Sequence, residues 1–138
     1  MQRQTWQTVA ILGVLLAVAA AVCQSNPALL KADIPFPFVV ADHTLPAGRY
    51  AVSTLGEQTL RIAGSHKQGA FVLTAAVPGH ASESSKTLVF YRYQDTYFLA
   101  QVWGPANGTG RQLHKSRAEE ELEYKRIEKQ IAVLRAEK

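Results

Sequence analysis

The stretch TLVFYRYQDTYFLAQVW, residues 87–103, decides the fold of this chain. Two runs rich in β-branched and aromatic residues, Thr87–Tyr93 and Thr96–Trp103, flank the pair Gln94-Asp95. Runs of this composition around a two-residue connection are typical of a β-hairpin. We therefore predict two antiparallel strands joined by a turn at Gln94-Asp95.

A two-residue turn also predicts the register of the hairpin. The expected pairs are Arg92 with Tyr97, Phe90 with Leu99, Leu88 with Gln101, Tyr91 with Phe98 and Val89 with Ala100. One face then carries Leu88, Phe90, Tyr97, Leu99 and Trp103, and the other carries Val89, Tyr91, Phe98, Ala100 and Val102. Both faces are apolar, whereas a strand with one side in water alternates apolar and polar residues. We expect one face to pack on other strands and the second to need a helix, a partner or a ligand.

The residues before the hairpin also favour strands. Residues 29–40 form an extended segment in which Pro35 and Pro37 cannot donate ladder hydrogen bonds, so we expect it at a sheet edge or a crossing point. Further strands are predicted over Arg49–Thr54, Leu60–Ala63 and Ala70–Ala76. Residues 26–115 are thus predicted to be a mainly β domain, an antiparallel six- to seven-stranded sandwich or partly open barrel.

The pattern changes to a helical period at residue 116. Ser116 and Glu119 form a capping box, which is typical of a helix start. An apolar stripe follows at spacings of 3, 4 and 3, made of Tyr124, Ile127, Ile131 and Leu134. We predict one long amphipathic C-terminal α-helix over residues 116–138. Its stripe either packs on the sheet of the same chain or serves as an interaction surface for another chain.

The first 25 residues have the organisation of a signal peptide. The 14-residue apolar run Val9–Val22 follows one positive charge and is shorter than the roughly 20 residues that span a bilayer. We expect a secreted or periplasmic protein. Cys23, the only cysteine, permits an alternative in which a lipid on it anchors the chain, although Val22 does not suit a lipobox. Membrane attachment is expected only in that case.

The charge distribution argues against a nucleic-acid partner. The net charge is +4, but residues 24–110 carry six basic and five acidic side chains, and residues 111–138 carry eight and six. Neither segment forms the one-signed stripe that neutralises a row of phosphates.

Residues with catalytic or metal-binding chemistry are scattered. The four histidines, His43, His66, His80 and His114, lack the spacing that directs two imidazoles at one metal. No nucleophile motif is present, so we predict neither an enzyme nor a metal or cofactor site. An aromatic ligand face remains a hypothesis beside a core role for the same residues, Tyr91, Tyr93, Tyr97 and Trp103.

Five motifs carry a resemblance to a known group. They are IPFPFVV (34–40), LPAGRY (45–50), LVFYRY (88–93), QVW (101–103) and SRAE (116–119). With them the chain resembles a group of small, exported, uncharacterised bacterial proteins of the Acidobacteria type, over nearly all of the domain after the signal peptide. The resemblance implies export and a β-domain with a C-terminal helical tail. It implies no activity and no binding residues.

The sequence thus favours an exported, non-catalytic β-domain that acts through protein–protein contacts in the cell envelope or outside the cell. The partner is an unknown protein or a second copy of this chain, contacted through the C-terminal helix. The alternative is a carrier of a small apolar ligand or a sugar, with its site in the barrel or sandwich. A hydrolase built from loop residues is the third hypothesis.

Overall fold

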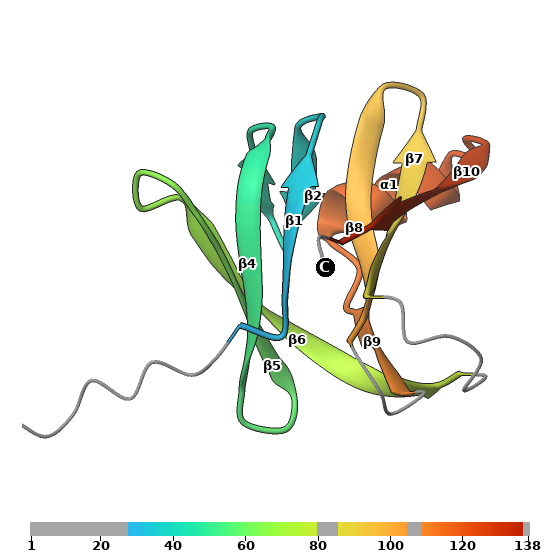
Figure 1. The fold of residues 1–138 in the computed structure, drawn as a ribbon. Coiled ribbons are helices and arrows are strands. Elements are labelled where there is room, and N and C mark those ends of the chain that lie inside the picture. The colour runs from blue at the N-terminus through green and yellow to red at the C-terminus, as the bar shows by residue number, and fades with distance from the viewer. Residues whose placement is uncertain (1–27, 80–85, 105–108, 137–138) are drawn as a thin grey trace, which may run out of the picture.

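The computed structural model describes residues 28–79, 86–104 and 109–136. Within these ranges the chain forms ten strands and one helix (Figure 1). In chain order they are β1 (Leu30–Ile34), β2 (Phe38–Val40), β3 (His43–Leu45), β4 (Gly48–Leu55), β5 (Thr59–Gly64), β6 (Gly69–Pro78), β7 (Thr87–Tyr93), β8 (Thr96–Trp103), β9 (Thr109–Leu113), α1 (Arg117–Tyr124) and β10 (Lys129–Arg135). The mainly β class is confirmed. The predicted signal peptide, with Cys23, lies outside the described residues.

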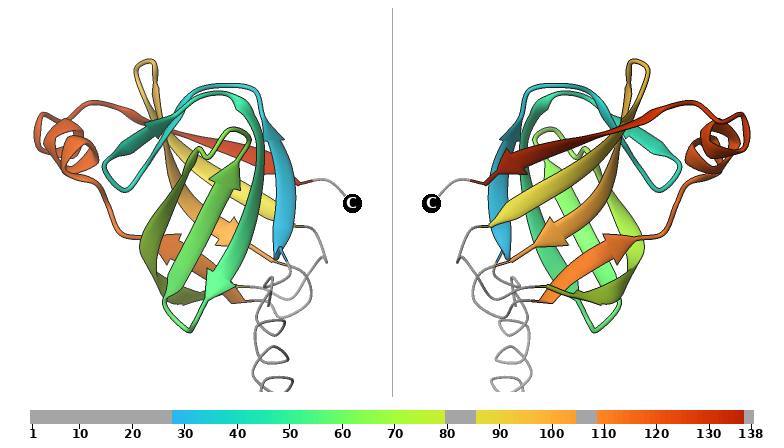
Figure 2. Two further views of the ribbon diagram at one scale, coloured as in Figure 1. Left: turned by 90° about the vertical axis from the view of Figure 1, so that its left-hand side faces the viewer. Right: turned by 90° about the vertical axis from the view of Figure 1, so that its right-hand side faces the viewer.

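The strands form one open sheet that folds into two layers. The hydrogen-bonded order is β1-β4-β5-β6-β9-β8-β2-β3, and β7 joins β8 to β10. Strand β6 belongs to both layers, because its first half pairs with β5 and its second half with β9. Figures 1 and 2 show the layer of β1, β4 and β5 opposite the layer of β7, β8 and β9. The arrangement is sandwich-like, and over the described residues the sheet does not close into a barrel.

The proline-containing segment crosses between the layers. As its two prolines predict, β1 is an edge strand of the first layer, and the chain leaves it at Ile34 to enter β2 in the second. Strand β2 then pairs in parallel with β8. The predicted antiparallel pairing is therefore confirmed for every described strand pair except β2 with β8, whereas the predicted number of six or seven strands is too low. The strands β2 and β3 have only three residues each, which is too short for an alternation of apolar and polar residues to be recognised in the sequence.

The core lies between the two layers. Along β1 and β6 buried and exposed residues alternate, as the pleat of a strand requires. Phe38 and Phe90 are 1% and 0% exposed, and their rings meet edge to face with centroids 5.7 Å apart. Burying a side chain of this size contributes roughly 1.5–3 kcal/mol. The whole cluster is Leu30, Ala32, Ile34, Phe38, Val40, Leu45, Tyr50, Val52, Leu60, Ile62, Ala70, Val72, Leu88, Phe90, Leu99, Val102 and Leu113.

The hairpin of β7 and β8 has the strands and the turn that the sequence predicts, with one change of register. The predicted pairs of Arg92 with Tyr97, Tyr91 with Phe98 and Phe90 with Leu99 are present, and then a β-bulge at Ala100 shifts the pairing by one residue. The bulge places Val102 in the core and Trp103 on the opposite face from the predicted one, because a slip of one residue reverses the facing of every side chain beyond it. The predicted pairs that this overturns are Leu88 with Gln101 and Val89 with Ala100.

The C-terminal helix begins where the sequence predicts. Ser116 is the N-cap, and its hydroxyl accepts a hydrogen bond from the backbone N–H of Glu119 at 3.2 Å. The helix then ends at Tyr124, after eight residues. The prediction of one long helix over residues 116–138 is wrong.

The backbone after Tyr124 gives the physical reason for that ending. The N–H of Arg126 donates to the carbonyl of Glu123 at 2.9 Å, and Arg126 has a left-handed φ of 58°. The N–H of Ile127 donates to the carbonyl of Leu122 at 3.1 Å. These two bonds around a left-handed residue form a Schellman motif, which satisfies the last carbonyls and redirects the chain.

Residues 129–135, predicted to be helical, form β10, which pairs antiparallel with β7. Leu134 lies opposite Leu88 and Ala132 opposite Phe90, and both β10 side chains pack against the core cluster. The outer edge of β7 offers a row of hydrogen bonds and an apolar surface to any segment that can lie extended. This tertiary pairing outweighs the local helical period.

Candidate interaction surface

The outer face of β10, β7 and β8 is the side of this layer that turns away from the core. Side chains that pair across antiparallel strands share a face. Along β10 the residues on the outer face are Lys129, Ile131, Val133 and Arg135, opposite Tyr93, Tyr91, Val89 and Thr87 of β7. The bulge in β8 adds Trp103, whose indole N–H donates to Gln101 Oε1 at 3.2 Å.

Helix α1 covers one end of this face. The side chain of Tyr93 is 1% exposed, and its ring meets that of Phe98 edge to face at 5.7 Å. The Tyr93 hydroxyl donates toward two helix carboxylates, 3.3 Å from Glu119 Oε1 and 3.0 Å from Glu123 Oε1. Figure 1 shows α1 behind the hairpin, consistent with these contacts. The helix is thus held to the hairpin by polar bonds.

The two carboxylates at this contact have different electrostatic surroundings. Glu119 is 4% exposed, and burial raises the pKa of its carboxyl. The Nζ atom of Lys115 lies 2.7 Å from both oxygens of Glu123, and this hydrogen bond lowers the pKa of Glu123. Burial, followed by the hydrogen bond to Glu123, raises the pKa of Tyr93. We call Tyr93, Glu119, Glu123 and Lys115 the Tyr93 anchor and assign it the role of fixing α1.

Sequence reasoning did not find the Tyr93 anchor. It identified Glu119 only as part of the capping box. The four-residue spacing of Glu119 and Glu123 places both on one side of a helix and was the available signal. Tyr93, however, precedes Glu119 by 26 residues, so their contact depends on how the layers fold together.

The centre of the outer face is apolar and partly exposed. Ile131 is 65% exposed and Val133 is 63% exposed, although both are large aliphatic residues. Beside them Val89, Tyr91 and Trp103 are half-buried. We call these five residues the outer apolar face.

Cationic side chains lie at both ends of the β10 part of this face. Lys129 Nζ lies 4.4 Å from the centroid of the Tyr91 ring, which is cation–π distance. Arg135 is exposed at the other end of the strand. An apolar centre with charged or amphipathic residues at its margin is the usual composition of a protein interface.

The four residues of the predicted aromatic ligand face do not lie together. Tyr91 and Trp103 belong to the outer apolar face, and Tyr93 is buried beneath α1. Tyr97 lies on the core side, where its ring stacks on that of Phe36 at 3.8 Å. The alternation of side chains along the hairpin separates Tyr91 from Tyr97, helix α1 covers Tyr93, and the bulge in β8 moves Trp103 to the face of Tyr91.

The predicted apolar stripe is also divided. Tyr124 is 90% exposed at the end of α1, and Ile127 lies in the connection to β10. Leu134 packs against the core, whereas Ile131 points outward. Of the four, only Ile131 belongs to the outer apolar face.

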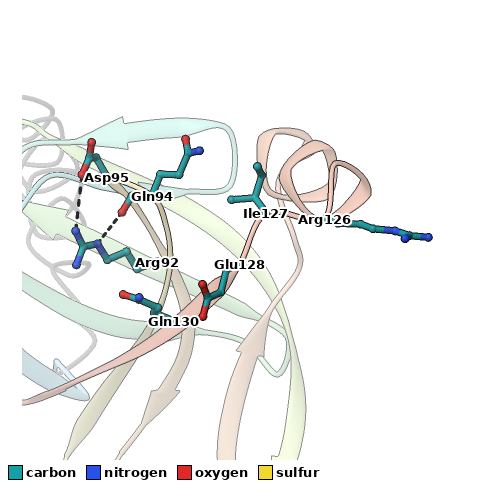
Figure 3. Close-up of a pocket in the computed structure, with 7 residues that line it drawn as sticks. All are labelled: Arg92, Gln94, Asp95, Arg126, Ile127, Glu128 and Gln130. Carbon is teal, nitrogen blue, oxygen red and sulfur yellow. Dashed lines mark hydrogen bonds and ion pairs between the residues drawn. The ribbon is translucent and has the colours of Figure 1, made fainter.

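A separate groove of about 500 Å³ lies between the hairpin turn and the α1–β10 connection (Figure 3). Arg92 is already engaged there: its Nε donates to the Gln94 carbonyl at 2.7 Å, and its guanidinium lies 3.7 Å from Asp95. Figure 3 shows Arg126 directed away from Arg92. The two guanidinium groups therefore do not converge on a common ligand position.

A second exposed apolar pair lies on the other layer. Phe71 and Leu73 of β6 are 63% and 58% exposed. Phe71 lies beside the exposed Arg61, its cross-strand partner on β5. Phe71 and Leu73 provide a comparison for the outer apolar face, because they are exposed to nearly the same extent as Ile131 and Val133.

Residues 28–79, 86–104 and 109–136 contain no group of three histidine, cysteine or acidic side chains arranged to hold a metal ion. Within the same ranges no helix has the length and apolar character needed to span a membrane.

No protein-family model matches this chain, and no curated protein or solved structure is detectably similar to it.

Proposed function

We propose that this protein is an exported, non-catalytic β-domain that acts through protein–protein contacts in the cell envelope or outside the cell, with the outer apolar face as its contact surface. The observation that carries the proposal is the exposure of Ile131 and Val133, at 65% and 63%, next to half-buried apolar residues of β7 and β8. Contiguous exposed apolar residues with a polar margin are typical of interaction sites. Covering the part of these two side chains that is still exposed would contribute roughly 1–2 kcal/mol each.

A ligand carrier has less support. The space between the two layers is occupied by the buried side chains of the core cluster, among them Phe38 and Phe90. A carrier of the barrel type keeps that space for its ligand.

Site-specific photo-crosslinking in cells that produce the protein tests the proposed surface. A photoreactive residue at position 133 is compared with one at position 71, since Val133 and Phe71 are both 63% exposed but lie on different layers. We expect a discrete protein adduct from position 133 that is absent from position 71. The substitution Ile131→Asp in the same chain should abolish the adduct. Equal adducts from the two positions, or none from position 133, would contradict the proposal.

Export rests on the 14-residue apolar run Val9–Val22. Intact-mass measurement of the protein recovered from the cell envelope or the medium tests it. We propose removal of the segment ending between Ala21 and Ser25. A mass that includes a lipid on Cys23 would favour the anchored alternative, and a full-length chain confined to the cytoplasm would contradict export.

A further inference from the structure

Among the described residues, strand β10 has a second edge with no neighbouring strand. In the part of the chain that the structure describes, β10 pairs with β7 alone. Figure 2 shows it at the outer margin of its layer. A free strand edge presents unpaired backbone donors and acceptors, to which another extended segment can bind.

One hydrogen bond identifies the backbone groups at this edge. The N–H of Ala136 donates to the carbonyl of Lys86 at 2.9 Å, so these two residues form a hydrogen-bonded pair of the β7–β10 ladder. Such pairs alternate along an antiparallel ladder, and the register of β10 with β7 is unbroken. Residues 130, 132 and 134 therefore bond to β7. The residues whose N–H and C=O groups point to the free edge are Lys129, Ile131, Val133 and Arg135.

The same four residues place their side chains on the outer face in the order basic, apolar, apolar, basic. Lys129 and Arg135 are exposed, and neither forms an ion pair within the described ranges. A segment added at this edge would therefore meet one positive charge at each end and two aliphatic side chains between them. Charge complementarity calls for acidic residues opposite the two cations.

A second copy of this chain does not meet that requirement when β10 pairs over its whole length. The two-fold register that pairs all of Lys129–Arg135 with the same strand of another copy is antiparallel about Ala132. That register places Lys129 of one copy opposite Arg135 of the other, at both ends of the pairing. Like charges directly opposite each other on neighbouring strands are destabilising.

We infer that β10 accepts an extended segment of a partner protein as an additional strand. This segment carries apolar residues opposite Ile131 and Val133 and acidic residues opposite Lys129 and Arg135. The inference rests on the proposed function and specifies the chemistry of the partner. Main-chain hydrogen bonds supply affinity, and the alternate side chains supply specificity.

A synthetic peptide tests this directly on the full chain. The probe is Glu-Thr-Val-Thr-Val-Thr-Glu, and the control peptide has lysine in place of both glutamates. We expect the control to bind about tenfold more weakly at low ionic strength, and added salt to reduce the difference. Binding should protect the amides of Ile131 and Val133 from hydrogen exchange in NMR spectra.

Variants of the chain then distinguish the contribution of the two cations to peptide binding from that of the main-chain hydrogen bonds. The double substitution Lys129→Glu and Arg135→Glu should reverse the preference between the two peptides. Val133→Pro removes an N–H that points to the free edge and leaves the bonds to β7, so it should abolish binding, whereas Val133→Ala should only weaken it. If the proline variant does not fold, the same question is answered by methylating the peptide amides that face β10.

The outcomes distinguish this inference from the proposed function. Two results together support strand addition. The Val133→Pro chain no longer binds the acidic peptide, and the chain with Lys129→Glu and Arg135→Glu prefers the lysine peptide to the acidic one. Failure of the acidic peptide to bind, while position 133 still forms its crosslink, overturns strand addition and leaves the proposed function standing. If the chain dimerises without peptide and this protects the amides of Ile131 and Val133 from hydrogen exchange, the partner strand is a second copy and the inference is overturned.

Discussion

The hydroxyl of Tyr93, at the end of β7, lies 3.3 Å from a carboxylate oxygen of Glu119 in α1. Both residues are buried, at 1% and 4% exposure. This bond, with that of Tyr93 to Glu123, joins the helix to the hairpin and defines how much of the outer face stays open.

Tyr93→Phe should destabilise the fold. It removes the donor to Glu119 and leaves a buried carboxyl without that partner, at a cost of about 1–2 kcal/mol in the free energy of unfolding. Chemical denaturation measures the change. The matched control is Tyr124→Phe, because Tyr124 is 90% exposed, and this variant should unfold at the same denaturant concentration as the parent chain. Equal effects of the two substitutions would show that the Tyr93 anchor is absent.

Glu119 should make stability depend on pH. Burial raises its pKa above the ordinary value of 4.5, so the folded chain keeps this proton to a higher pH than the unfolded chain does. The free energy of unfolding should therefore fall as pH rises from about 4.5 through the raised pKa.

Glu119→Gln should remove that part of the pH dependence. The glutamine keeps an acceptor for Tyr93 and cannot ionise, so its advantage over the parent should grow with pH above 4.5. Denaturation at a series of pH values measures it, with the exposed Glu120→Gln as control. If the free energy of unfolding changes with pH in the same way in the parent and the Glu119→Gln chains, burial does not raise the pKa of Glu119.

Arg126→Gly should stabilise the chain. Arg126 has a φ of 58° at the left-handed position of the Schellman motif, where glycine is free of the strain that a side chain brings. We expect a gain of up to about 1 kcal/mol in the free energy of unfolding. Lys125→Gly is the control, because Lys125 has a φ of −74° and should show no gain. A loss of stability with Arg126→Gly would argue against this turn.

Gly64→Ala should destabilise the first layer. A Cβ atom at position 64 would lie 2.6 Å from a ring carbon of Tyr50, the cross-strand partner of Gly64. Overpacking of this kind costs about 1–3 kcal/mol. In a Tyr50→Ala background the same substitution should cost little, since the ring is gone. Thermal unfolding of the four chains checks this, and additive effects would contradict the contact.

The parts of the fold predicted correctly are those that neighbouring residues determine. The hairpin strands and the Gln94-Asp95 turn follow from local composition, and the Ser116 cap follows from a local hydrogen bond. The bulge at Ala100 depends instead on how β8 fits the core and β9. Its effect on Trp103 could not be read from spacing.

The C-terminal segment shows why a period alone is insufficient. Spacings of 3, 4 and 3 from Tyr124 to Leu134 suit a helix, but Ile131 and Val133 also alternate as in a strand. The free energy that decides between them comes from the open edge of β7, which a local pattern does not contain. The proposed interaction surface overlaps the sequence-based expectation in part: one hairpin face was expected to need a helix, a partner or a ligand, and Ile131 was among the candidate residues. Its position on an edge strand was not expected.

Amide hydrogen exchange along residues 129–135 of the full chain tests the central claim most directly. If β10 is an edge strand with a free outer edge, the amides of Ala132 and Leu134 exchange slowly because they bond to β7. The amides of Ile131 and Val133 exchange fast because they face solvent. Slow exchange at all four positions, as in a continuous helix or a strand already paired on both sides, would contradict the account.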